Sequence, residues 1–147
     1  NKNEYYKAFT EAEDKLNSGE LTFFVYTILG LIEWAQESLI EELGIKIDQL
    51  DKATVLRDEL RREHALSTNA TLLLYAVMQE ELFDTTKSMT LEDAGGDLML
   101  TKQTIRKYVD ELAGASLIEF TGRRPLRFRA SEALRTRIQA KREWGME

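Results

Sequence analysis

The stretch TKQTIRKYVDELAGASLIEFTGRRPLRFRA, Thr101 to Ala130, changes its hydrophobic period from that of a helix to that of a strand. Its first part starts at a suitable N-cap, Thr101, and ends at Gly114, which favours a helix over 101–113. Beyond it, Ser116–Thr121 and Leu126–Ala130 have the two-residue alternation of half-buried strands. The stretch therefore predicts a helix followed by a hairpin. The inward face of the helix is formed by Ile105, Tyr108, Val109 and Leu112.

Basic and amide side chains lie on the opposite face of this predicted helix and on the hairpin. Residues of these types contact phosphates and base edges in a major groove. The hairpin turn carries two further arginines, and two more alternate with Leu126 and Phe128 along the second strand. We expect these side chains to point outward. They are Lys102, Gln103, Arg106 and Lys107 on the helix and Arg123, Arg124, Arg127 and Arg129 on the hairpin.

Two helices are predicted upstream of this stretch. The first covers residues 68–84, and the second is a short helix over 90–95, opened by Thr90 as N-cap and by acidic residues in its first turn. Gly95 and Gly96 each weaken a helix by about 1 kcal/mol relative to alanine. We therefore expect the short helix to end there, or the following turn to be open.

The order of elements over residues 68–130 resembles the winged helix-turn-helix superfamily of DNA-binding domains. This order is a helix, a short helix, a basic helix and an arginine-rich hairpin. The run TLEDAGGDLMLTKQTIRKYVDELAGASLIEF carries most of the likeness. The resemblance implies a recognition helix 101–113 in the major groove and an arginine-rich wing 121–130 along phosphates or in the minor groove. It implies DNA contacts by Thr101, Lys102, Gln103, Thr104, Arg106, Lys107, Arg123, Arg124, Arg127 and Arg129.

Charge is distributed unevenly along the 147 residues, whose formal net charge is −6. Residues 1–68 carry 8 Lys/Arg against 14 Asp/Glu, residues 69–100 carry 1 against 6, and residues 101–147 carry 11 against 6. The last third is thus a basic module on an acidic body. This asymmetry fits an anion-binding end attached to a part that does not bind anions.

The N-terminal region predicts helices over 4–16, 21–43 and 48–62, with Gly44 as the end of the second and Asp48 as the N-cap of the third. The second is apolar nearly all round in its first half, so protein must surround it. Two interpretations remain open: a second copy covers it, or it is the central helix of a monomeric bundle. The candidate dimer or partner interface is Phe23, Phe24, Tyr26, Ile28, Leu31 and Trp34, and a pocket for a small effector beside these aromatic residues is a further possibility.

Other functions find little support in the sequence. The longest apolar run, Leu21–Ile32, reaches about 18 Å as a helix against roughly 30 Å of bilayer hydrocarbon, so we expect no membrane contact and no signal peptide. The chain has no cysteine and one histidine, His64, and it lacks a phosphate-binding glycine-rich loop. We expect no enzyme activity, cofactor or metal, and a cytoplasmic, nucleoid-associated location if the source is prokaryotic.

The expected fold is mainly α with a small β-hairpin, arranged as a helical region 1–66 for dimerisation or partner binding, a winged helix domain 67–130 and a C-terminal helix 131–147. The expected function is that of a sequence-specific DNA-binding protein, a transcriptional regulator acting as a homodimer on double-stranded DNA. The alternative is a winged-helix protein-interaction subunit of a larger assembly, such as a chromosome-maintenance or replication accessory complex, with the N-terminal helices docked on another protein.

Overall fold

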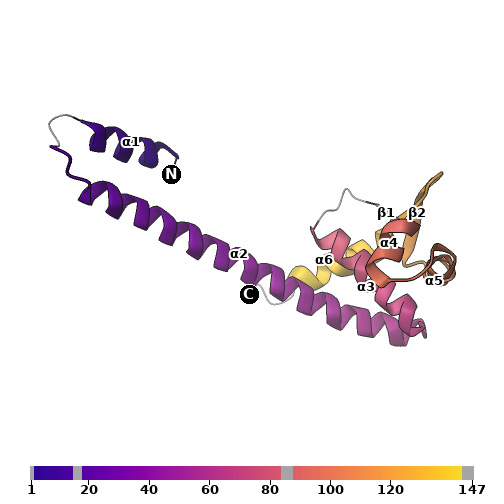
Figure 1. Ribbon diagram of the computed structural model, residues 1–147. Coiled ribbons are helices and arrows are strands. Elements are labelled where there is room, and N and C mark those ends of the chain that lie inside the picture. Colours follow the sequence, from indigo (N-terminus) through magenta and orange to yellow (C-terminus); the bar gives the residue numbers. More distant parts are fainter. Residues whose placement is uncertain (1, 15–17, 84–87, 144–147) are drawn as a thin grey trace. The chain divides into compact units, whose positions relative to one another are not determined.

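The computed structural model describes residues 2–14, 18–83 and 88–143 (Figure 1). The chain divides into two compact units, Asn1–Lys46 and Ile47–Glu147. The long helix α2, Thr22–Glu63, contributes its first half to one unit and its second half to the other.

In the first unit, helix α1, Lys2–Glu13, covers one face of the first half of α2. Ala8 is buried in this contact, and the Phe9 ring meets the Phe24 ring edge to face at 6.2 Å between centroids. Tyr5 stacks on Phe9 at 6.4 Å. Most other large apolar side chains of this unit remain exposed.

The continuity of α2 differs from the expected break at Gly44. The 42-residue helix passes through Gly44, and Asp48 is not an N-cap but pairs with Lys52 one turn later, at 2.8 Å between Oδ2 and Nζ. A single glycine weakens a helix by only about 1 kcal/mol, so a long helix tolerates it. Ion pairs at i,i+4, here Lys46–Glu42 at 2.7 Å and Lys52–Asp48, support the helix on both sides of Gly44.

The length of α2 is also relevant to whether this helix can cross a membrane. The most apolar 18-residue window of α2 has a mean hydropathy of 1.2, and none of it is buried. By length and composition alone, α2 is able to cross a membrane. The expectation of no membrane contact relied on the shorter run Leu21–Ile32, and helix length does not exclude such contact.

The second unit contains three more helices, a small sheet and a C-terminal helix after the second half of α2. In chain order these are α3 Thr68–Phe83, β1 Met89–Thr90, α4 Leu91–Leu98, α5 Lys102–Gly114, β2 Ile118–Arg123, β3 Leu126–Ala130 and α6 Glu132–Glu143. The expected fold class, mainly α with a small β element, is confirmed.

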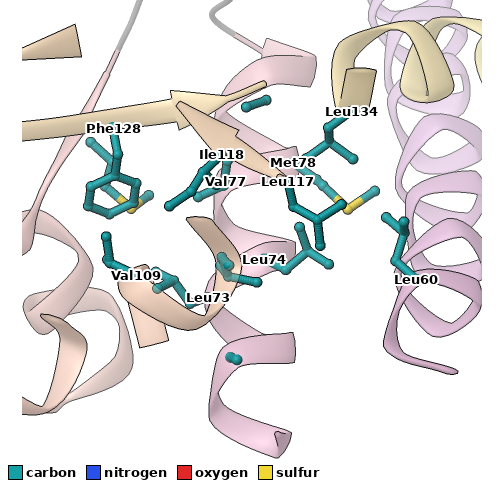
Figure 2. Close-up of a cluster of buried hydrophobic side chains, with 14 of the residues drawn as sticks. Leu60, Leu73, Leu74, Val77, Met78, Val109, Leu117, Ile118, Phe128 and Leu134 are labelled. Carbon is teal, nitrogen blue, oxygen red and sulfur yellow. The ribbon is translucent and has the colours of Figure 1, made fainter. Parts of the chain in front are cut away.

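The core of this unit forms around α3, which is apolar on most sides (Figure 2). α2, α5, the sheet and α6 each contribute side chains to the same cluster. Because the cluster draws on every one of these elements, the positions of α5 and the hairpin are fixed by burial. Its central members include Leu60, Leu73, Leu74, Val77, Met78, Val109, Leu117, Ile118, Phe128 and Leu134.

The sheet has three antiparallel strands in the order β1–β3–β2, one more than the hairpin that the sequence predicts. The additional strand is β1, in which Met89 pairs with Phe128 and Thr90 with Arg127. In β2 the pairing shifts by one residue between Phe120 and Gly122, which is a β-bulge. Strand β2 also extends to Arg123, so the turn is the dipeptide Arg124–Pro125, joined by a cis peptide bond.

Helix α6 begins at Ser131, whose Oγ accepts a hydrogen bond from the Leu134 amide at 3.2 Å. Its Leu134 and Ile138 side chains are buried. Two ion pairs also connect α6 to the second half of α2. Arg137 Nη1 lies 2.7 Å from Glu63 Oε2, and Lys141 Nζ lies 2.8 Å from Glu59 Oε1. The hydrogen bond from Arg137 lowers the pKa of Glu63. α6 thus packs within the second unit.

Candidate nucleic-acid interface

Helix α4 begins with a capping box. The Asp93 amide donates to Thr90 Oγ1 at 3.2 Å, and Asp93 Oδ2 accepts from the Thr90 amide at 3.0 Å. Both donors would otherwise lack a partner at a helix N-terminus. The cap places the start of α4 directly after β1, so the short helix is fixed to the sheet.

The Gly95–Gly96 pair does not end α4, which continues to Leu98 and is followed by Met99 in the left-handed conformation, φ 52°. Gly95 is buried, and a Cβ at this position would lie 2.8 Å from the Leu100 carbonyl oxygen. The Leu100 amide donates to the Gly95 carbonyl at 3.0 Å. Gly95 therefore permits the turn to fold back closely onto α4, whereas a Cβ on Gly96 would meet nothing within 4 Å.

Helix α5 has a buried face and an exposed face, as the sequence predicts. Ile105, Val109 and Leu112 are buried, and Tyr108 is half-buried. At its N-terminus the Thr104 amide donates to Thr101 Oγ1 at 3.3 Å, and the two hydroxyls lie 2.8 Å apart. Thr104 is half-buried, so its hydroxyl serves the cap. The exposed face carries Lys102, Gln103, Arg106 and Lys107, together with Asp110.

Two polar contacts fix α5 to the N-terminus of α3. Glu111 accepts hydrogen bonds from the Ser67 amide at 2.7 Å and from Ser67 Oγ at 2.9 Å. Asn69 Nδ2 donates to the Tyr108 hydroxyl at 2.8 Å. A carboxylate at a helix N-terminus is favoured by the helix dipole as well as by hydrogen bonding. These contacts orient α5 without using its exposed face.

An ion pair connects the two helices of the helix-turn-helix. Lys102 Nζ lies 2.9 Å from Glu92 Oε2, and both side chains are largely exposed. The sequence pattern does not predict this partner for Lys102. The two residues are ten positions apart, so helical spacing gives no sign of the pair.

The hairpin arginines divide into two groups. Arg123, Arg124 and Arg127 are exposed. Arg129 is half-buried, and its Nε lies 2.7 Å from Glu119 Oε1, directly across the β2–β3 ladder. The same carboxylate oxygen accepts from Arg135 Nη2 at 2.9 Å. Arg129 is therefore bound within the protein, while the other three arginines are available at the surface.

Glu81 of α3 lies close to this arginine and glutamate group. Burial raises the pKa of the Glu81 carboxyl above its usual value, and the charges of Arg135 and Arg129 oppose that rise. Glu81 also lines a small hollow with Met89, Phe128 and Arg129. The Nε of Arg135 is buried without a hydrogen-bond partner among the described residues. The group contacts α3, the sheet and α6, and it fastens the hairpin base to the core.

The candidate interface residues in the first unit also divide. Phe24, Ile28 and Leu31 are half-buried on the face that α1 covers, whereas Phe23, Tyr26 and Trp34 are exposed, Phe23 to 77%. A shallow hollow of about 420 Å³ lies beside α1, lined by Glu4, Thr27, Gly30, Leu31 and Trp34. Among the described residues no cluster of three or more His, Asp or Glu side chains is placed to hold a metal ion.

The search of solved structures gives a match of low similarity. No protein-family model matches the chain, and no curated protein matches it. The chain resembles the crystal structure of the multiple antibiotic-resistance repressor MarR from Listeria monocytogenes 4b F2365, with 18% identity over 75% of this chain and 72% of that chain and a TM-score of 0.41.

The fold is assigned from the topology of the chain itself. A helix, a short strand, a capped short helix, a turn, a two-faced helix and a two-stranded wing follow one another, with all three strands in one antiparallel sheet. Apart from the short strand β1, the resemblance drawn from the sequence has the same order of elements. Residues 68–130 form a winged helix-turn-helix.

Proposed function

We propose that this chain is a sequence-specific DNA-binding regulator that acts as a homodimer. The observation that carries the proposal is the exposed face of α5. Four side chains of the types that bind phosphates and base edges lie there, opposite the face that buries Ile105, Val109 and Leu112. The working division is a self-association region 1–66, a DNA-binding domain 67–130 and a C-terminal helix 131–147. In a prokaryotic source, a regulator of this kind acts in the cytoplasm on the nucleoid.

In the proposed complex the first turns of α5 enter the major groove. Gln103 and Arg106 have the geometry for bidentate contacts with adenine and guanine, and Lys102 and Lys107 contact phosphates. Arg123, Arg124 and Arg127 of the wing lie along the backbone or in the adjacent minor groove. Arg129, by contrast, supports the wing from within because Glu119 holds it.

Self-association gives two winged units, and each reads one half-site. In helix-turn-helix dimers the half-sites are separated by one helical turn of DNA, about 34–36 Å. A dimer also doubles the number of phosphate contacts, which raises affinity steeply at low salt.

Fluorescence anisotropy with labelled random duplex DNA over a salt series tests the proposal. We expect binding at low salt, with a logarithmic affinity that falls linearly with the logarithm of salt concentration. The triple variant Lys102→Ala, Arg106→Ala, Lys107→Ala should lose this binding while keeping its helical circular dichroism. Gln103→Ala should keep random-DNA binding and change the sequence selected from a randomised library. Absence of wild-type binding at low salt contradicts the proposal.

A second candidate function is protein docking by the winged helix. One observation favours it: α4, which borders the exposed face of α5, carries exposed Glu92 and Asp97, and these carboxylates repel phosphate. Under this alternative the basic face binds an acidic protein surface in a larger assembly. A folded protein that binds no duplex DNA even at low salt supports it.

A further inference from the structure

A regular apolar stripe follows the exposed side of the first half of α2, away from α1. Its members recur at spacings of four and three residues, which is the heptad pattern of a coiled coil. The apolar members are between 48% and 56% exposed. We call this stripe the seam; it consists of Val25, Leu29, Ile32, Gln36, Leu39 and Leu43.

The seam and the α1-covered face are different sides of the same helix. At about 100° per residue, the six seam positions lie within about 40° of a common direction. The face of Phe24 and Leu31 is turned roughly 100° from that direction, and Phe23 and Trp34 are turned close to 180°. The seam therefore stays open although α1 is in place.

We propose that the seam of one chain pairs with the seam of a second copy in a parallel, in-register coiled coil. This proposal rests on the proposed function, of which it specifies the dimer. It places the dimer interface at the seam and not at the aromatic residues Phe23, Phe24, Tyr26 and Trp34. Its length, from Val25 to Leu43, is about 27 Å at 1.5 Å per residue. All of its positions but one are Val, Leu or Ile, the residue types that fill knobs-into-holes packing.

The exception, Gln36, argues for a second copy rather than a different protein. With Leu29 and Leu43 it occupies the position that faces its own counterpart in a parallel in-register dimer. A buried amide needs a hydrogen-bond partner, and the amide of the second Gln36 can both donate and accept. In any other register the amide faces an apolar residue. One polar residue in an apolar seam is therefore a means of fixing parallel register.

The flanking positions agree with this arrangement. Leu29, Gln36 and Leu43 are seven residues apart and are equivalent positions of the seam. In a parallel pair, the residue that precedes each of them faces the residue five places later in the other chain. Glu42 then faces Ile47 of the second copy, and Ile28 faces Glu33 of the second copy. No carboxylate is placed opposite a carboxylate, although the helix is acidic here.

A lipid surface is the competing occupant, since α2 has the length and composition of a membrane-crossing helix. However, the apolar 18-residue window 23–40 includes Glu33 and Glu37, which lie off the seam. Each charged side chain at the centre of a bilayer costs about 2.5–3.5 kcal/mol on insertion scales. A helix with two carboxylates inside its apolar stretch matches a protein partner better than lipid on all sides.

Size-exclusion chromatography with light scattering tests the interface. The wild type should show about twice the 17.0 kDa of the chain. Leu29→Glu should give a monomer with unchanged helical circular dichroism, whereas Phe23→Glu, the same change on the opposite face, should remain dimeric. A monomeric wild type, or a Phe23→Glu variant that dissociates while Leu29→Glu does not, overturns the proposal. So does a monomeric wild type that floats with phosphatidylcholine vesicles.

Cysteine cross-linking tests the register, since the chain has no cysteine of its own. Gln36→Cys should form a covalent dimer quantitatively on mild oxidation, because in-register pairing brings its two copies within disulfide range. Trp34→Cys, on the far side, should not. A wild type of dimeric mass whose Gln36→Cys variant fails to cross-link overturns the parallel register.

DNA anisotropy on the same samples separates the two proposals. A dimer that cross-links at Gln36→Cys but binds no duplex DNA retains the seam and rejects the DNA-binding function. A monomer that binds duplex DNA with a steep salt dependence rejects the seam and retains that function.

Discussion

Lys102 and Glu92 form an ion pair across the turn between α5 and α4, with Nζ 2.9 Å from Oε2. In the proposed complex this pair must open, because Lys102 then binds a phosphate that the Glu92 carboxylate repels. In that proposed complex the Glu92 side chain therefore opposes DNA binding.

Glu92→Gln should raise the affinity for random duplex DNA. An exposed ion pair contributes at most about 1 kcal/mol, so the gain is up to about fivefold. Lys102 contacts its phosphate in both proteins, so the salt slope should stay nearly the same. Anisotropy over a salt series measures both. Asp97→Asn, which removes the same charge from α4, is the control, and an equal gain of affinity in both variants contradicts the specific role of the pair.

The two glycines of α4 should respond in opposite directions to alanine. Gly95→Ala places a Cβ 2.8 Å from the Leu100 carbonyl oxygen, so the turn must shift, and overpacking of this kind costs about 1–3 kcal/mol. Gly96→Ala meets nothing and gains up to about 1 kcal/mol of helix propensity. Thermal unfolding followed by circular dichroism compares them. Equal shifts in both variants would falsify the role given to Gly95.

Arg127 and Arg129 are neighbours on β3 with different expected roles. Arg127→Ala should weaken binding to all DNA sequences alike and reduce the salt slope by about 0.9, with little change in melting temperature. Arg129→Ala breaks the pair with Glu119 and should cost about 1 kcal/mol of stability while the salt slope is kept. Anisotropy and thermal unfolding on both variants decide. A stability loss in Arg127→Ala alone contradicts the assignment.

Glu81 should make stability depend on pH in the acidic range. Burial raises its pKa in the folded state, so the folded protein binds a proton more tightly than the unfolded chain does. This stabilisation is complete below the unfolded value and is lost as pH rises through the folded value. Glu81→Gln should therefore melt at a higher temperature than the wild type at pH 7. The difference should shrink toward pH 4; a constant difference at both pH values argues against a titrating Glu81.

The residues of α5 were predictable because their periodicity is unambiguous. Every third or fourth position from Ile105 to Leu112 is apolar, and the caps at Thr90, Thr101 and Ser131 have side chains suited to the role. Local chemistry of this kind needs no knowledge of the rest of the fold.

The misjudged features depend on contacts distant in sequence or on competition between weak local effects. Gly44 and Asp48 suggest a break, yet the helix around them outweighs a cost of about 1 kcal/mol. Strand β1 has two residues, too few to show a period. The Arg129–Glu119 pair follows from the hairpin register, so a register assigned from the sequence would have found it.

The two faces of α5 have separate tasks. Ile105, Val109 and Leu112 hold the helix in the core, and Glu111 fastens it to α3, while Gln103 and Arg106 take no part in either. Under the proposed function, a change of the outward residues would alter the DNA sequence recognised and leave the folding free energy nearly unaltered. A scaffold of this kind can therefore evolve new specificities. A few substitutions on one face of a helix are enough, and the fold does not change.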